Sequence, residues 1–399
     1  MKTTTAKSYS GASRRITIIF HHAGGGHRNA ADALKEVLES QNPPWDVGLL
    51  NLQELLAPLD VVRRTTGLNI EGTYNLILRK GWTRFTPQLL VLLQRTIRVA
   101  HSRIVKLLRS YWMEHPSDVV LSVIPHFNRE IAESLINGDR KTPFVTLLTD
   151  IADYPPRFWI EPNSEFLIVG SDRAKQQALT MGHSPDRTFQ TSGMILKPRF
   201  YHELAIDRAA ERKRHGLDPD CATAIILFGG HGSGVMLDIA KKLDSMDLQL
   251  ILICGHNEKL ASRLRSLKMR RPMLVEGFTG NVEYFMGMAD FFIGKPGPGS
   301  ISEALQLHLP VIVECNSKTL PQERYNTEWV TENGYGIVVK SFRGIVPAVQ
   351  RMLDPGNFRQ FRSKAATYSN RALLEIPTIL EKCLSSVHQS DQEMFSCKG

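Results

Sequence analysis

The sequence predicts an α/β protein made of two doubly wound, Rossmann-like domains, and three observations support this prediction. The chain has 399 residues, 42% of them hydrophobic, which is too long for one ordinary core but sufficient for two. Apolar strand-like runs alternate with helical patterns, as they do in parallel sheets. Each half also opens with a glycine-rich turn between a strand and a helix. We therefore expect two domains that face a central cleft.

Composition indicates the cellular compartment in which the protein is expected. The five cysteines are odd in number and widely spaced, so the sequence indicates neither a disulfide framework nor a metal cluster. The N-terminal stretch MKTTTAKSYSGASRR has no apolar core of signal-peptide length, and no apolar run reaches the roughly eighteen residues of a membrane span. We expect a cytoplasmic protein that meets a membrane only from the side.

The first domain is expected at residues 15–195, after a flexible N-terminus at residues 1–14. Its strands are predicted at Arg15–Phe20, Asp46–Leu52, Asp118–Ile124, the run that ends at Asp150, and Glu165–Ser171. Residues 196–220 are charged, contain prolines and lack a strand pattern, which is typical of a linker.

A run of three glycines that includes Gly25 and Gly26 separates the first strand from the first helix, and His27 follows it directly. The run is neither a Walker loop nor a dinucleotide fingerprint, because the required spacing is absent. A histidine at a helix N-terminus stays neutral more readily than its usual pKa of about 6.5 implies. His27 is therefore a candidate general base. A histidine that only caps or packs at the turn is the alternative.

Three further polar residues come directly after predicted strands. They are His126, Asp150 and Asp153, and the carboxyl ends of parallel strands lie on the side of the sheet where His27 is expected. Each is a candidate for orienting His27 or the acceptor, and Asp150 or Asp153 is the alternative proton acceptor. Hydrogen bonding within a loop is the other interpretation of each.

The net charge of +9 is concentrated in one segment. Between Tyr74 and Trp112 there are eight basic residues and no acidic residue. From Pro87 onward the pattern predicts an amphipathic helix whose polar face carries Arg95, Arg98, Lys106 and Arg109. Basic amphipathic helices are typical of anionic membrane surfaces. A core-packing helix with a solvated basic face is the alternative, and nucleic-acid binding is disfavoured because no aromatic strand platform accompanies the helix.

The second domain is expected at residues 221–356, followed by C-terminal helices and a tail at 357–399, of which the last fifteen residues look frayed. Its first turn is Phe228–Gly234, and a second glycine turn lies within Gly294–Asn326. We expect Ser300 or Ser302 to cap the helix after this second turn, with Glu303 in its first turn. Such helix N-termini offer N–H groups and partial positive charge to phosphate.

The motifs GGGHRNAADAL, FGGHGSG, VEGFTGNV, GKPGPGSISEAL and PQERYN, in this order, resemble those of a known family. They are similar to the GT-B glycosyltransferases of the monogalactosyldiacylglycerol synthase type, family 28, which are related to the N-acetylglucosaminyltransferase that makes peptidoglycan lipid II. The resemblance spans roughly Arg15 to Lys340. It implies a UDP-sugar in the C-terminal domain and a lipid acceptor in the N-terminal domain.

The resemblance also implies roles for particular residues. Glu303 would bind the ribose hydroxyls, Phe278 and Thr279 would frame the uracil, and the diphosphate would lie on Ser233 and on the backbone of the neighbouring glycines. Gln322, Glu323 and Asn326 would face the donor sugar; the peptidoglycan enzyme has a second glutamine where Glu323 stands. The two glycine turns contribute the remaining expected donor-site residues: Gly230, Gly232, Gly234, Gly297, Pro298, Gly299 and Ser300. Gly25, Gly26 and His126 would line the acceptor side.

The expected reaction is an inverting transfer of galactose or glucose from a UDP-sugar to diacylglycerol or a related glycolipid, with no metal and no cofactor. Helix N-termini would stabilise the departing UDP. An acceptor that is not a glycerolipid, polyprenyl or small-molecule, is one alternative, and a non-catalytic peripheral lipid-binding protein is another. An epimerase or hydrolase of similar build would be expected to carry a dinucleotide fingerprint or a Tyr-X-X-X-Lys motif, and neither is found.

Overall fold

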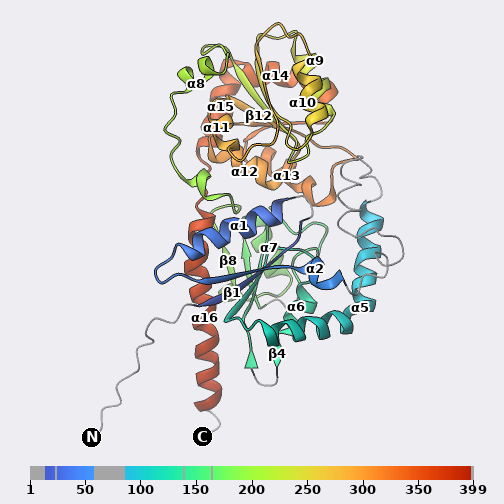
Figure 1. The fold of residues 1–399 in the computed structure, drawn as a ribbon, viewed down its shortest axis with the longest axis vertical. Helices are drawn as coiled ribbons and strands as arrows, with labels where there is room; N and C mark the ends of the chain where they lie inside the picture. Colours follow the sequence, from blue (N-terminus) through green and yellow to red (C-terminus); the bar gives the residue numbers. More distant parts are fainter. Residues whose placement is uncertain (1–13, 23–24, 58–85, 138–139, 163–164, 397–399) are drawn as a thin grey trace, which may run out of the picture.

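The structure is a computed structural model that describes residues 14–22, 25–57, 86–137, 140–162 and 165–396 (Figure 1). Within these ranges the backbone alone is described at 86–96, 137, 140–141 and 388–396. Most of the expected flexible N-terminus, the first half of the basic segment and the side chain of Arg95 lie outside the described residues.

The first domain contains a six-stranded parallel sheet in the order β2-β1-β3-β6-β7-β8, as predicted. Its elements are β1 (Arg15–Phe20), α1 (Gly26–Glu39), β2 (Asp46–Asn51), α2 (Leu52–Leu56), α5 (Thr86–Glu114), β3 (Val119–Ser122), α6 (Asn128–Ser134), the hairpin β4 (Ile136–Asn137) and β5 (Arg140–Lys141), β6 (Phe144–Leu147), β7 (Phe166–Val169), α7 (Asp172–Thr180), η3 (Pro185–Arg187) and β8 (Thr188–Gln190). Strand β2 ends one residue earlier than predicted, because Asn51 caps α2 by accepting a hydrogen bond from the Gln53 amide.

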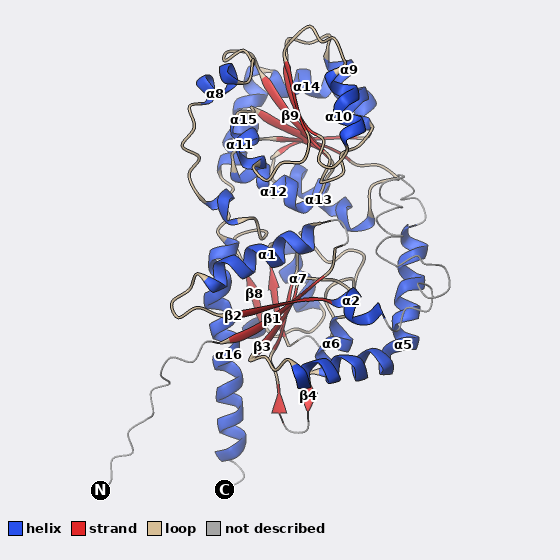
Figure 2. Ribbon diagram, viewed as in Figure 1, coloured by secondary structure: helices blue, strands red, loops and turns tan. Residues whose placement is uncertain are grey.

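The second domain repeats this architecture with a sheet in the order β11-β10-β9-β12-β13-β14. Its elements are β9 (Thr223–Leu227), α9 (Val235–Leu243), β10 (Gln249–Ile253), α10 (Glu258–Arg265), β11 (Met273–Glu276), α11 (Val282–Gly287), β12 (Phe291–Gly294), α12 (Pro298–Gln306), β13 (Val311–Glu314), α13 (Pro321–Glu332), β14 (Gly336–Val339), η5 (Phe342–Gly344), α14 (Ile345–Leu353), α15 (Pro355–Ala366) and α16 (Ala372–Ser396). In both domains helices cover the two faces of the sheet (Figure 2).

Strand β1 shows why the sheets need cover on both sides. Ile16, Ile18 and Phe20 pack against the cluster that includes α1 and α16, whereas Ile19 packs against the cluster that includes α5 and α6. Strands that are apolar on both faces are typical of parallel sheets. The sheet of domain two is covered in the same way by two separate clusters.

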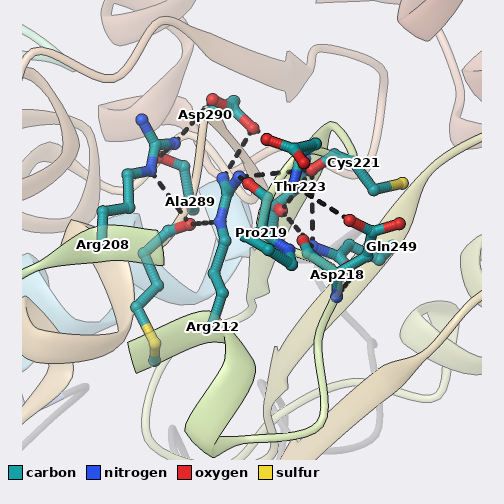
Figure 3. Close-up of polar contacts among 11 residues, drawn as sticks. Arg208, Arg212, Asp218, Pro219, Cys221, Thr223, Gln249, Ala289 and Asp290 are labelled. Carbon is teal, nitrogen blue, oxygen red and sulfur yellow. Dashed lines mark hydrogen bonds and ion pairs between the residues drawn. The ribbon is translucent and has the colours of Figure 1, made fainter. Parts of the chain in front are cut away.

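The segment between the domains is more structured than the sequence suggests. It contains η4 (Pro198–Tyr201) and a helix, α8 (Arg208–Arg214). The buried Arg212 guanidinium donates to the carbonyl oxygens of Met288 and Pro219 and pairs with Asp290, which also accepts from Arg208 (Figure 3). This network fixes α8 to the residues that precede β12. The segment therefore belongs to domain two over its second half.

The C-terminal helix belongs to domain one. Leu373, Ile376 and Leu380 of α16 are fully buried in the same cluster as β1 and α1, and α16 runs from the junction of the domains along domain one (Figure 1). The helix continues to Ser396, so the expectation of a frayed C-terminal stretch is wrong over most of its length. The chain thus crosses between the domains twice.

Two sets of contacts hold the domains together. In the first, Asn370, which precedes α16, donates to the Met194 carbonyl of domain one at 2.7 Å, and its backbone amide donates to Gln306 Oε1 of α12 in domain two at 3.3 Å. In the second, the ring of Tyr154 stacks on the ring of Tyr325 from α13, with centroids 5.6 Å apart. The second contact brings the loop after β6 against the start of α13.

Candidate functional site

The site in domain one lies where the strand order reverses, since β1 has β2 on one side and β3 on the other. Gly25 adopts a φ of 79° and lets the chain enter α1. The Nδ1 atom of His27 lies 2.7 Å from the Val123 carbonyl oxygen, which follows β3, and 3.1 Å from Thr149 Oγ1. Because a carbonyl only accepts, Nδ1 of the neutral ring carries the proton and Nε2 is the basic nitrogen.

The environment of His27 keeps the imidazole neutral. Burial lowers the pKa of His27 to about 4, although the hydrogen bond to Val123 acts in the opposite direction. At neutral pH the ring is therefore uncharged, which the predicted role of general base requires. Its position does not support a purely capping role, because α1 has no side-chain cap.

His126 lies beside His27 in a strained backbone conformation. Its φ is 76°, and its ring packs edge-on against Phe158 with centroids 4.5 Å apart. Burial and, to a smaller extent, the charge of His27 lower the pKa of His126 to about 4. Its Nδ1 is buried and has no hydrogen-bond partner among the described residues. Strain and an unsatisfied polar atom together are typical of functional positions.

Asp150 and His27 are connected by Trp159. The indole Nε1 donates to Asp150 Oδ2 at 2.8 Å, and the indole ring lies 5.7 Å from the His27 ring. Burial raises the pKa of Asp150 to about 7; the indole hydrogen bond lowers it, the charges of Glu323 and Asp153 raise it, and the charge of Lys295 lowers it. Glu323 and Lys295 belong to domain two, so charges of domain two act on this carboxyl group across the junction.

Asp153 has a different role. Its carboxylate accepts hydrogen bonds from the backbone amides of Arg157, Phe158 and Trp159 at 2.7–2.9 Å. These bonds hold the loop that positions Trp159. The loop interpretation of Asp153 therefore fits the structure better than a catalytic one.

The donor side lies where the strand order of domain two reverses, with β9 between β10 and β12. The turn Phe228–Gly234 follows β9, and the turn Lys295–Gly297 follows β12. Gly232 has a φ of 56°, and a Cβ atom there would lie 2.7 Å from the Cys254 carbonyl oxygen. The next helices, α9 and α12, have Gly234 and Gly297 at their N-caps and no side-chain cap. At α9 the first N–H group, that of Val235, donates to Ser233 Oγ at 3.4 Å, and the next two donate to the carbonyls of Ser233 and Gly234. No capping side chain accepts from the first turn of α12.

The expected cap of α12 is wrong. The helix begins at Pro298, so Ser300 and Ser302 lie inside it and Glu303 lies beyond its first turn. Pro298 explains the difference, because proline is preorganised for the first helical position. Gly299 and Ser300 lie in the first turn, and Ser302 is fully buried.

Glu303 has the environment of a ligand-binding carboxylate. It receives no hydrogen bond from the residues that the structure describes. Burial raises the pKa of Glu303 to about 7, with Lys197 lowering it and Glu283 raising it. Hydroxyl donors would stabilise the charged form of this group.

Phe278 and Thr279 lie on the loop after β11. Phe278 is 65% exposed and stacks on His256, with ring centroids 4.0 Å apart. The His256 amide donates to the Gly230 carbonyl at 2.9 Å, so this aromatic pair adjoins the first glycine turn. Thr279 Oγ1 accepts from the Asn281 amide.

The three polar residues expected at the donor sugar differ in the structure. Glu323 Oε1 lies 3.1 Å from Lys295 Nζ. Asn326 is fully buried, and its amide donates to the Pro296 carbonyl at 2.8 Å, so it braces the turn before α12. Gln322 is also buried, at 9% exposure. Of the three, Glu323 is the residue whose charge raises the pKa of Asp150 in domain one.

The expected membrane-facing residues form a separate surface on α5. Ile97, Ile104 and Leu108 are buried against the sheet, whereas three of the expected cations, Arg98, Lys106 and Arg109, are exposed. Arg103, which the expected polar face did not include, is exposed as well. Val99 and Met113, 91% and 74% exposed, lie on the same side of the helix. In the described part of the chain, no helix is both long and apolar enough to cross a bilayer.

Three residues at the site escape the sequence analysis. Lys295 directly follows β12, and His256 is in the loop that follows β10, positions that could have indicated them. Nothing in the sequence places Trp159 between His27 and Asp150. Across the described ranges, no cluster of three or more His, Cys, Asp or Glu side chains has the arrangement of a metal site.

Two Rossmann-like domains, each with its strand-order reversal at a glycine turn, define the GT-B class. Solved structures agree: MurG of Acinetobacter baumannii matches with a TM-score of 0.60 at 10% identity, covering 92% of this chain and 99% of that one. A putative UDP-N-acetylglucosamine 2-epimerase from Listeria monocytogenes matches with a TM-score of 0.58 at 12% identity, covering 93% and 96%. At these identities the matches establish the fold alone.

Similarities in sequence point to a narrower group of proteins than the fold does. Residues 225–375 match the glycosyltransferase family 28 C-terminal domain. The monogalactosyldiacylglycerol synthase of Spinacia oleracea is 26% identical over 361 residues, which is 86% of this chain and 66% of the spinach protein. The second half of this GT-B chain is therefore similar to the family 28 C-terminal domain, and the resemblance to the monogalactosyldiacylglycerol synthase type is confirmed.

Proposed function

We propose that the protein transfers a hexose, galactose or glucose, from a UDP-sugar to the hydroxyl of diacylglycerol or a related glycolipid at a membrane surface, with inversion at the anomeric carbon. The observation that carries this proposal is the junction of the domains, where the charges of Lys295 and Glu323 of domain two act on Asp150, which is joined through Trp159 to the His27 ring. The family 28 domain and the spinach relative support a sugar donor and a lipid acceptor.

The donor would occupy the carboxyl ends of the domain-two strands. Phe278 offers an exposed aromatic face to the uracil, and Glu303 offers an acceptor for ribose hydroxyls. The diphosphate would lie on the N-termini of α9 and α12, where Gly232 allows close backbone approach. This arrangement directs the anomeric carbon of the sugar toward domain one.

The reaction is a single displacement. The acceptor oxygen attacks the anomeric carbon from the face opposite the diphosphate and forms the new glycosidic bond. The bond from that carbon to the diphosphate oxygen breaks, and the electron pair leaves with UDP. His27 Nε2 takes the hydroxyl proton, while the Val123 carbonyl holds the ring in the required tautomer. Nothing in this sequence of steps requires a metal ion.

The exposed face of α5 would hold the protein at the membrane. Four cations and two exposed apolar side chains lie on it, a combination that suits an anionic lipid surface. The acceptor hydroxyl would then reach His27 without leaving the interface.

Release of UDP with different acceptors tests the proposal against its alternatives. UDP-galactose and UDP-glucose should each be supplied with diacylglycerol liposomes, a polyprenyl lipid, a soluble alcohol, or no acceptor. We expect rapid release with diacylglycerol and slow release without an acceptor. Preference for the polyprenyl lipid or the alcohol would identify a different acceptor. Liposome binding with no release from either donor would favour a non-catalytic lipid-binding protein.

A further inference from the structure

Lys295 occupies the space between the two glycine turns of domain two. It is the first residue after β12, and its side chain is 40% exposed. A Cβ atom at Gly229 and one at Gly297 would each lie 3.5 Å from Lys295 Cε. Gly229 opens the turn that leads to α9, and Gly297 is the N-cap of α12. The end of the lysine side chain therefore lies beside the first turn and next to the N-terminus of α12.

In the free protein this ammonium group has one carboxylate partner. Lys295 Nζ lies 3.1 Å from Glu323 Oε1, whose side chain is 11% exposed. The Glu323 carboxylate also lies 3.8 Å from the position of a Cβ atom at Gly297. A partly exposed pair of this kind contributes little to folding, so its place at the strand-order reversal calls for another explanation.

A diphosphate would compete strongly for the same ammonium group. It carries more negative charge than a carboxylate and would meet the N-terminal N–H groups of α9 and α12 together with the lysine. Glu323 and Lys295 both act electrostatically on Asp150. A change of partner at Lys295 would therefore also change the electrostatic environment of Asp150 on the acceptor side.

We propose that Lys295 changes partner during the reaction, leaving Glu323 to bind the diphosphate of the donor. This inference rests on the proposed function, because it assumes a UDP-sugar at the strand ends of domain two. Lys295 then neutralises the charge that develops on UDP as the bond from the anomeric carbon to the diphosphate oxygen breaks. The released Glu323 carboxylate becomes an acceptor for a hydroxyl of the sugar.

The partner exchange predicts opposite effects for its two members. Lys295→Met should weaken UDP binding by about 10- to 100-fold, the range for a hydrogen bond to a charged group, and should weaken uridine binding much less. Glu323→Gln should tighten UDP binding by about two- to fivefold, because the competing partner is gone. A pair that served only the fold would give both variants the same effect.

The test is isothermal titration calorimetry of UDP and uridine with the wild type, Lys295→Met, Glu323→Gln and the double variant. The inference holds if the lysine variant loses UDP affinity in both backgrounds. It is overturned if the lysine variant binds UDP like the wild type, or if Glu323→Gln weakens UDP binding as much as Lys295→Met does. Glu323→Gln removes the same ion pair and keeps the lysine. If Lys295→Met fails to fold, tighter UDP binding by Glu323→Gln than by the wild type supports the inference, and equal or weaker binding overturns it.

The same titrations separate this inference from the proposed function. A wild-type protein that does not bind UDP would overturn both. A wild-type protein that binds UDP and transfers sugar, with an unchanged Lys295→Met variant, would overturn the partner exchange alone.

Discussion

The pH dependence of kcat identifies the proton acceptor, because His27 and Asp150 have different pKa values. The pKa of His27 is about 4 and that of Asp150 is about 7. At pH 7, roughly one His27 ring in a thousand is therefore protonated, against about half of the Asp150 carboxyls. If His27 is the base, kcat stays level from pH 8 to about pH 5 and falls only near 4. If Asp150 is the base, kcat falls below about pH 7.

Removal of the imidazole should have a large effect on chemistry and a small one on folding. His27→Ala should lower kcat by roughly 10²–10⁴, the usual range for loss of a general base, which corresponds to about 3–5 kcal/mol of activation free energy. The variant also loses one hydrogen bond to the Val123 carbonyl, worth about 1 kcal/mol of stability. UDP affinity should be nearly unchanged, because the donor residues lie in domain two.

The assay is kcat from UDP release at saturating donor and acceptor, measured across the pH range for the wild type, His27→Ala and Asp150→Asn. Folding must be monitored at each pH. Because burial lowers the pKa of His27, its contribution to stability is present above about pH 6.5 and is lost as the pH falls toward 4. The raised pKa of Asp150 acts in the opposite sense, with stability present below about pH 4 and lost as the pH rises through 7.

One result would refute the assignment of His27. It is a wild-type limb near pH 7, together with a His27→Ala variant that keeps most of its kcat and an Asp150→Asn variant that loses it. The proton acceptor would then be Asp150, with Trp159 as the residue that orients it.

Three further predictions concern the donor pocket, the membrane face and the linker. Glu303→Gln should raise the KM for the UDP-sugar by an equivalent of about 2 kcal/mol; because the free carboxyl has a pKa of about 7, wild-type UDP affinity should also fall below pH 7 more steeply than that of the variant, and parallel pH curves would place the ribose elsewhere. Replacing the four exposed cations of α5 by Gln should weaken binding to anionic liposomes by about 1 kcal/mol per charge, whereas replacing Lys241, Lys259, Arg263 and Lys268 of domain two should not; equal losses in a flotation assay would argue against a specific face. Arg212→Ala should destabilise the protein by about 3 kcal/mol in urea unfolding, because it removes the buried donor to the Met288 and Pro219 carbonyls and leaves Asp290 with Arg208 as its remaining ionic partner. Arg214→Ala, at a 74% exposed side chain of the same helix, should cost less than about 1 kcal/mol.

The elements closest to the site were the most predictable. Strands β1 and β9 are apolar on both faces, and each is followed by a glycine turn. The hydrophobic pattern and the turn residues therefore indicate the same strand boundary. The same agreement predicted that His27, His126 and Asp150 would come together, because all three follow parallel strands of one sheet. Local sequence thus determined which end of each sheet carries the polar groups.

The remaining features depend on contacts between distant segments. Helix α12 begins earlier than its two serines indicate, because Pro298 is preorganised for the first helical position. The Lys295–Glu323 pair joins residues 28 positions apart, and the burial of Asn326 depends on its bond to Pro296. The packing of α16 on domain one depends on an apolar face whose partner no local pattern identifies.

The most direct test of the account is the structure of the lipid product made by the purified protein. UDP-galactose or UDP-glucose would be incubated with diacylglycerol liposomes, and the product would be isolated and its anomeric configuration determined by NMR. Because these donors have an α-linked sugar and the proposed displacement inverts, the account predicts a β-linked hexosyl diacylglycerol that the His27→Ala variant makes far more slowly. An α-linked product, free hexose, an epimerised donor or no turnover would contradict it.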